Sequence, residues 1–188
     1  MRAYLRYLFV VVALVFGLSI SATADDGKGG FKLEGAWVAK VVGTPGQWSY
    51  VVSPDPSGRR ASAVGSVDIG FSANGACFGQ AEFEPSDSAS PILINIVMTG
   101  PDTASYYAIW YGLKDLGPDS PLTNEIVLIG VVKGEFQFIA PGKMSGTHNF
   151  EIYQPTADAD NDGLPDEGAV AACMFPASTV DTRLPMPD

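Results

Sequence analysis

Beyond residue 24, the chain alternates hydrophobic and polar side chains with a period of two. In segment 59–72 the serines and Asp68 take one phase, and the other phase holds Ala61, Ala63, Val67, Ile69 and Phe71. Segment 147–154 repeats the pattern, with Phe150 and Ile152 opposite Asn149 and Glu151. This period is typical of strands that bury one face and hydrate the other. The alternation therefore predicts an all-β fold.

Further strands are predicted where β-branched and aromatic residues gather, at 90–100, 104–114 and 124–140. Turn residues separate these runs, and Gly130 and Gly134 predict a bulge or a bend within the longest one. We expect about eight strands of mostly antiparallel sheet, closed into a barrel, with a β-sandwich as the alternative. The long segments favour the barrel, because long strands must twist and bend to close.

The first 24 residues have the features of a secretory signal peptide. Arg2 and Arg6 precede an apolar run at 7–20, and the small residues of 22–24 suit a signal peptidase. A membrane anchor is the alternative, but the run is shorter than the ~20 residues of a spanning helix. We expect a single mature domain, residues 25–188, that is secreted or periplasmic and has no further membrane span. The leader and the acidity are typical of a bacterial exported protein.

Charge limits the classes of partner. The formal net charge is −10, and removal of the two leader arginines brings it to −12. A surface this acidic repels a phosphate backbone, so nucleic acid is not an expected partner. Cations and basic surfaces are the natural partners of such a chain.

The chain contains two cysteines, Cys77 and Cys173. Outside the cytoplasm, two thiols in one small domain usually pair, so we predict a Cys77–Cys173 disulfide. Closure of so long a loop stabilises a fold by about 4–5 kcal/mol in the chain-entropy model. Two buried thiols are the alternative.

An acidic segment near the end of the chain has the spacing of a calcium loop. Oxygen ligands recur at alternate positions, and the candidates are Asp158, Asp160, Asp162, Asp166 and the backbone carbonyl of Leu164. Gly163 permits the sharp turn that brings such ligands together. Carboxylates are hard ligands that suit a hard cation. We therefore predict calcium as the cofactor.

This D-x-D-x-D-G-x-x-D segment resembles the loops of EF-hands, thrombospondin type-3 repeats and dockerin-like modules. It differs at Ala169, where EF-hands have a bidentate glutamate, and at Pro165, which has no N–H. Glu167 lies beside the expected ligands as a further acid. We predict a single loop at 158–169 between the last two strands, with a Kd of ~0.1–1 mM. A solvated acidic hairpin is the alternative, although its like charges repel one another without a cation.

A second resemblance lies at the start of the first predicted strand. Gly35-x-Trp37 is similar to the Gly-x-Trp motif of the lipocalins, which are up-and-down barrels that hold small apolar ligands. That family also has an arginine on its last strand that packs over the tryptophan, and Arg183 matches that position. The resemblance implies a barrel that carries a small apolar molecule.

Little in the sequence points to catalysis. His148 is the one histidine, there is no G-x-S-x-G stretch, and no glycine-rich phosphate loop is present. Tyr106, Ala108 and Trp110 share a face that we expect in the core, and the tyrosines of the other face form a surface or, alternatively, an aromatic wall for a ligand. We expect a secreted non-catalytic β-domain that binds calcium in a structural or interaction role. A lipocalin-like carrier and a secreted hydrolase are the alternatives.

Overall fold

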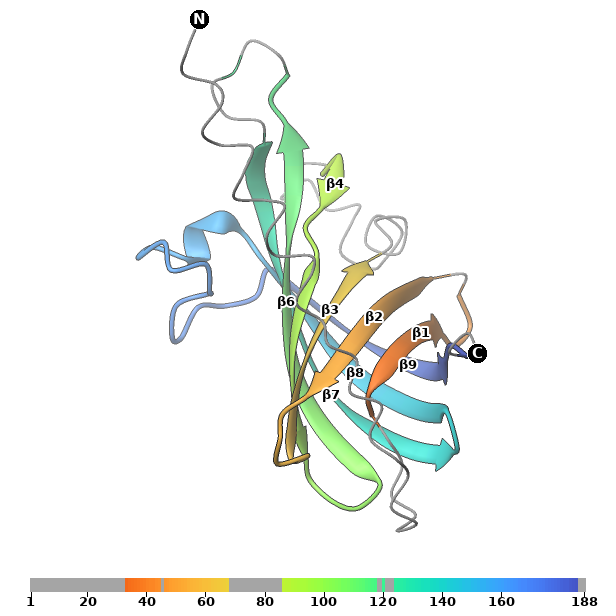
Figure 1. Ribbon diagram of the computed structural model, residues 1–188. Helices are drawn as coiled ribbons and strands as arrows, with labels where there is room; N and C mark the ends of the chain where they lie inside the picture. Colours follow the sequence, from red (N-terminus) through yellow and green to blue (C-terminus); the bar gives the residue numbers. More distant parts are fainter. Residues whose placement is uncertain (1–32, 45, 68–85, 118–119, 121–123, 186–188) are drawn as a thin grey trace, which may run out of the picture.

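The computed structural model describes residues 33–44, 46–67, 86–117, 120 and 124–185 (Figure 1). The predicted signal peptide, Cys77 and the end of the predicted 59–72 strand lie outside these residues. The strands are β1 Gly35–Val41, β2 Gln47–Pro54, β3 Arg60–Val67, β4 Ser88–Ala89, β5 Ile92–Met98, β6 Thr103–Asp115, β7 Asn124–Ala140, β8 Lys143–Tyr153 and β9 Cys173–Arg183.

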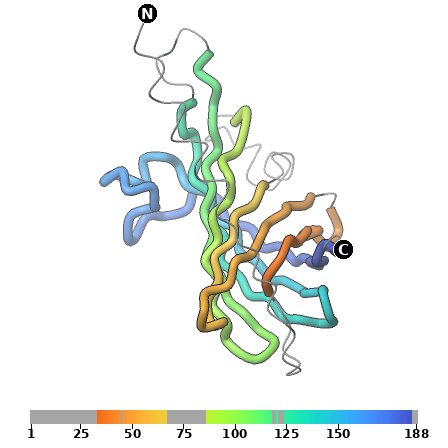
Figure 2. Tube along the Cα trace, in the orientation of Figure 1, coloured from red at the N-terminus to blue at the C-terminus, as the bar shows by residue number. Residues whose placement is uncertain are grey.

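Eight of these strands form a closed antiparallel barrel, which confirms the predicted fold class. Each strand pairs with its neighbour along the chain, in the order β1-β2-β3-β5-β6-β7-β8-β9, and β9 closes the ring on β1 (Figures 1 and 2). The short β4 pairs with β6 just before the start of β5. Closure leaves no open sheet edge between the first and last strands.

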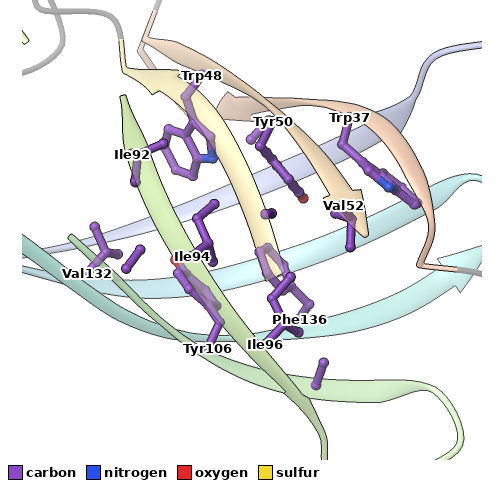
Figure 3. Packing of buried hydrophobic residues seen from close by; sticks show 14 of the residues in the cluster. Trp37, Trp48, Tyr50, Val52, Ile92, Ile94, Ile96, Tyr106, Val132 and Phe136 are labelled. Atoms are coloured by element: carbon purple, nitrogen blue, oxygen red, sulfur yellow. The ribbon is translucent and has the colours of Figure 1, made fainter. Parts of the chain in front are cut away.

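Side chains of the inward phase fill the middle of the barrel. Ala61 and Ala63 are buried, as the alternation predicted, and Tyr106, Ala108 and Trp110 are buried on β6. Figure 3 shows tryptophans, tyrosines and isoleucines of several strands converging on this interior. The rings of Tyr106 and Phe136 stack with centroids 4.7 Å apart. Most of the side chains that fill the interior are thus aromatic or aliphatic.

Gly130 and Gly134, where we predicted a bulge or a bend, are not at a bulge. The register of β7 shifts opposite Gly112–Leu113 and again between Phe138 and Ala140, away from both glycines. A Cβ on Gly130 would lie 2.2 Å from the indole ring of Trp110. This glycine therefore allows an inward ring to approach the backbone of β7 closely.

The outer face departs from the simple alternation at Glu151. We expected a hydrated side chain, yet Glu151 is only 8% exposed. Its Oε2 accepts hydrogen bonds from Lys133 Nζ and from the Tyr153 hydroxyl, both at 2.8 Å. The carboxylate is buried because these neighbours on the same outer face cover it and satisfy it. Among the described residues, no helix has the length and apolar character needed to cross a bilayer.

Candidate functional site

Residues 154–172, here called the acidic loop, connect β8 to β9, which is the predicted location of the calcium loop. The segment begins with a 3-10 turn, η2 (Pro155–Ala157), and projects from the side of the barrel as the blue lobe in Figures 1 and 2. Its sequence contains five acidic residues and no basic residue. A concentrated negative charge is therefore attached to one side of the barrel.

The acidic loop is fixed to the barrel by a small hydrophobic cluster. Four buried residues of the outer face form its centre, namely Ile109, Ile129, Val131 and Tyr153. Tyr107 and Tyr111 of β6 pack against them together with three alanines of the loop segment, Ala157, Ala169 and Ala171. The tyrosine-bearing face predicted for β6 is thus partly covered by the chain itself.

A hydrogen bond joins the same face to the turn of the loop. The Tyr111 hydroxyl donates to the backbone carbonyl oxygen of Gly163 at 2.7 Å. Burial raises the pKa of Tyr111, and the nearby carboxylates of Asp158 and Asp162 raise it further. The hydroxyl therefore remains protonated and keeps its role as a donor at neutral pH.

Three of the predicted ligands come together. Asp158, Asp160 and Asp166 each offer a carboxylate oxygen, and these oxygens lie within 4.8 Å of one another. Such a group could hold a metal ion. Asp162 is not a member of this group, and its Oδ1 accepts a hydrogen bond from the backbone N–H of Leu164 at 2.8 Å.

Backbone N–H groups hold the carboxylates in place. Asp158 accepts from Asp162 N at 3.0 Å and from Gly163 N at 3.1 Å, through its two oxygens. Asp166 Oδ2 accepts from Ala159 N at 3.1 Å, which connects the two ends of the curl. A carboxylate has about four lone-pair positions, so these bonds leave sites free for a cation.

The curl depends on residues in the left-handed region of the backbone. Gly163 has φ of 90° and Asn161 has φ of 59°. Asparagine and glycine tolerate this region better than other residues. A Cβ on Gly163 would also lie 2.9 Å from the Tyr111 hydroxyl oxygen, so glycine allows both the turn and the contact with the barrel.

Gly35, Trp37 and Arg183 also lie together. Trp37 and Arg183 are register partners of β1 and β9, and a Cβ on Gly35 would be 2.8 Å from Arg183 Nε. The indole N–H of Trp37 donates to the carbonyl oxygen of Leu33 at 2.8 Å. These residues join the first strand to the last one at the seam of the barrel.

A polar group inside the barrel was not found from the sequence. His148, Thr179 and Asp181 are buried on β8 and β9, and they connect with the hydroxyls of Tyr50 and Tyr106. His148 is only 4% exposed. The missed signal was the alternation in β9, which places Thr179 and Asp181 in the same phase as Phe175 and Ala177.

No protein-family model, curated protein or solved structure matches this chain. Functional inference therefore rests on local geometry and chemistry. Cys173 begins β9 and is partly buried, whereas Cys77 lies outside the described residues. The disulfide between them stays a prediction.

Proposed function

We propose that the protein is a non-catalytic β-barrel domain that binds one calcium ion in its acidic loop. The observation that carries the proposal is the convergence of Asp158, Asp160 and Asp166 in a loop that the barrel already anchors. Hard carboxylate oxygens on a curled loop are the ligands that Ca²⁺ prefers. Backbone carbonyls and water would supply the remaining coordination positions.

The role that we infer for the ion is structural. The acidic loop covers the outer cluster around Ile109 and Val131, so its position determines whether those apolar side chains meet water. Like charges that lie within a few ångströms repel one another, and the loop has no basic residue of its own. A bound cation would remove this repulsion and hold the loop over the cluster.

The expected affinity is modest. Three carboxylates without a bidentate glutamate favour a Kd of ~0.1–1 mM, as in extracellular calcium modules. At ten times its Kd, calcium would stabilise the folded state by about 1.4 kcal/mol through mass action. Such a site would serve a secreted or periplasmic protein exposed to abundant calcium, which is the location that the leader predicts.

The carrier alternative has less support. Aromatic and aliphatic side chains occupy the described interior (Figure 3). A mostly apolar cleft at one end of the barrel, lined in part by Leu33, Ala61 and Met98, has a volume of ≈ 260 Å³. This is below the ~300–1,000 Å³ that is usual for small-molecule pockets. For the hydrolase alternative, His148 is not an accessible base, since it is buried and both of its ring nitrogens are hydrogen-bonded.

A matched pair of variants tests the proposal. Asp160→Asn removes one carboxylate of the cluster, and Glu135→Gln removes one exposed carboxylate of β7 with the same change in net charge. Calcium should raise the Tm of the wild type and of Glu135→Gln, chelator should reverse the rise, and Asp160→Asn should lose most of it. An equal calcium response in wild type and Asp160→Asn would overturn the proposal.

A further inference from the structure

A connected set of polar side chains lies inside the otherwise apolar barrel. Of the described residues that are buried in the interior, the titratable ones are Tyr50 on β2, Tyr106 on β6, His148 on β8 and Asp181 on β9. Strands β1, β3, β5 and β7 contribute buried apolar side chains to the same space. The nearest charged group along β9 is Arg183, which packs against Gly35 at the barrel seam.

Hydrogen bonds run from Tyr106 to Thr179 through the histidine. The Tyr106 hydroxyl lies 2.5 Å from His148 Nδ1, and His148 Nε2 lies 2.7 Å from Thr179 Oγ1. Burial raises the pKa of Tyr106, so this hydroxyl is a donor and Nδ1 is the acceptor. The neutral imidazole must then carry its proton on Nε2 and donate to Thr179.

Asp181 forms the other end of the set. Its side chain is 0% exposed, and its Oδ2 accepts a hydrogen bond of 2.5 Å from the Tyr50 hydroxyl. Its Oδ1 is buried and makes no hydrogen bond of regular geometry. Burial raises the pKa of Asp181, while the neighbouring hydroxyls of Thr179 and Tyr50 lower it, and burial prevails. An ionised Asp181 would thus be a buried charge with an unsatisfied oxygen.

Two glycines make room for this set. A Cβ on Gly146 would lie 2.4 Å from His148 Cε1, and a Cβ on Gly134 would lie 2.7 Å from Tyr106 Cε1. Around the ring, Trp48 and Phe136 pack edge-on with centroids 5.4 Å and 5.7 Å away. The imidazole is therefore held in one orientation by backbone and aromatic neighbours, which a chance surface histidine would not be.

We propose that Tyr50, Tyr106, His148, Thr179 and Asp181 form a proton-binding unit inside the barrel, which takes up one proton as a unit on acidification. The unit with an ionised Asp181 and a neutral His148 has one net negative charge. One added proton cancels that charge, whereas a second would create a buried cation. The proton can enter at Asp181 Oδ1, or at His148 Nδ1 if the Tyr106 hydroxyl rotates to accept.

Thr179 lies between the two acceptors, because its hydroxyl meets the imidazole N–H and its side chain shares the buried phase of β9 with Asp181, two residues further on. Interacting sites of this kind titrate in steps that belong to the pair rather than to either residue. The unit is separate from the acidic loop, which lies outside the barrel wall. The proposal of a proton-binding unit therefore does not depend on calcium binding.

The direction of the stability effect follows from each group. Burial lowers the pKa of His148 from 6.5 to about 4, so its contribution to stability is present above pH 6.5 and is lost as the pH falls toward 4. The raised pKa of Asp181 acts in the opposite sense, because the folded state then binds a proton before the unfolded chain does. Acidification should therefore protonate the unit at a smaller cost in folding stability than a buried imidazolium alone would cause.

NMR can follow the unit directly, since His148 is the one histidine of the chain. Imidazole ¹⁵N and Asp181 carboxyl ¹³C shifts of the wild type should show the Nε2–H tautomer at pH 7 and one common midpoint for both groups below pH 6. Asp181→Asn should move the histidine midpoint down by roughly half a pH unit or more, because a neighbouring negative charge favours the imidazolium. Glu135→Gln, on the outer face, should leave it unchanged.

Three results would overturn the proposal. The first is a His148 midpoint near 6.5 in the wild type. The second is an Asp181 carboxyl that titrates alone while the imidazole shifts stay constant. The third is a histidine midpoint that Asp181→Asn does not move. Since the common midpoint is measured on wild-type protein, a variant that fails to fold leaves the decisive comparison intact.

Discussion

The Tyr111 hydroxyl donates to the carbonyl oxygen of Gly163, and this 2.7 Å bond joins the outer wall of β6 to the turn of the acidic loop at which φ is 90°. The same turn presents its N–H to Asp158, a member of the carboxylate cluster. Barrel, turn and cluster are therefore connected through one residue. Substitutions on the barrel wall at this contact should therefore alter calcium binding at the candidate ion site.

Tyr111→Phe keeps the ring against the outer cluster and removes only the hydroxyl. We expect it to lower the free energy of unfolding by about 0.5–1.5 kcal/mol, the usual net value of one hydrogen bond. It should also weaken calcium binding, because the turn is less well held. Urea unfolding and calorimetric titration measure the two effects. Tyr107→Phe removes a hydroxyl from the same face without touching Gly163, and equal effects of the two variants would contradict the inferred link.

Gly163→Ala and Gly168→Ala separate backbone strain from crowding. Both glycines have positive φ, 90° and 85°, so each alanine should cost about 1–2 kcal/mol of conformational strain. A Cβ at 163 would also press on the Tyr111 hydroxyl, whereas a Cβ at 168 would meet nothing within 4 Å. Thermal unfolding should therefore show a larger loss for Gly163→Ala. If Gly168→Ala is the more harmful, the contact with Tyr111 contributes nothing.

Lys133→Met tests the ion pair on the outer face. Burial alone would raise the pKa of Glu151, but hydrogen bonds from Lys133, Tyr153 and Asn149 outweigh it and lower the pKa. The stability from this group is thus present above about pH 4.5 and is lost as the pH falls through the lowered pKa.

The Lys133 side chain is 53% exposed, so we expect a loss of only about 0.5–1 kcal/mol at pH 7. Urea unfolding at pH 7, 5 and 3 should show this difference shrinking toward acid. Lys143→Met, on the exposed start of β8, should show a smaller and flatter difference. If Lys133→Met loses the same free energy of unfolding at pH 3 as at pH 7, the ion pair is not the cause of that loss.

Gly130→Ala should disturb the core far more than its size suggests. The added methyl would lie 2.2 Å from the Trp110 ring, and overpacking of this kind costs about 1–3 kcal/mol. Tryptophan emission should change together with the urea midpoint. Gly58→Ala, in a turn with φ of 66° and open space around it, should lower stability without altering the emission. Native emission and stability in Gly130→Ala would contradict the packing described for β7.

The alternation of hydrophobic and polar residues was enough to predict the strands, because it shows which face of each strand is buried. Ala61 and Ala63 point inward as their alternation predicted, and the curl at Gly163 follows from a single residue type. Barrel closure is different, because it rests on the Trp37–Arg183 pairing of segments from opposite ends of the chain. Alternation alone is equally compatible with a sandwich.

The errors arose where a side chain depends on a distant partner. Glu151 is buried because Lys133 and Tyr153 satisfy it, and Gly130 is needed because the Trp110 ring lies over it. Asp162 belongs to the predicted ligand spacing, yet its carboxylate is not part of the cluster of Asp158, Asp160 and Asp166. Spacing gives the candidate ligands, but the three-dimensional path of the loop decides which carboxylates come together.

Native mass spectrometry of residues 25–188, the mature domain that the leader predicts, with and without millimolar calcium, tests the central proposal most directly. We predict one bound calcium ion per chain in the wild type and in Glu135→Gln. The ion should be lost with chelator and bound several-fold more weakly by Asp160→Asn. A wild-type protein that stays free of calcium at 10 mM, or that binds it equally after Asp160→Asn, would contradict the proposed site.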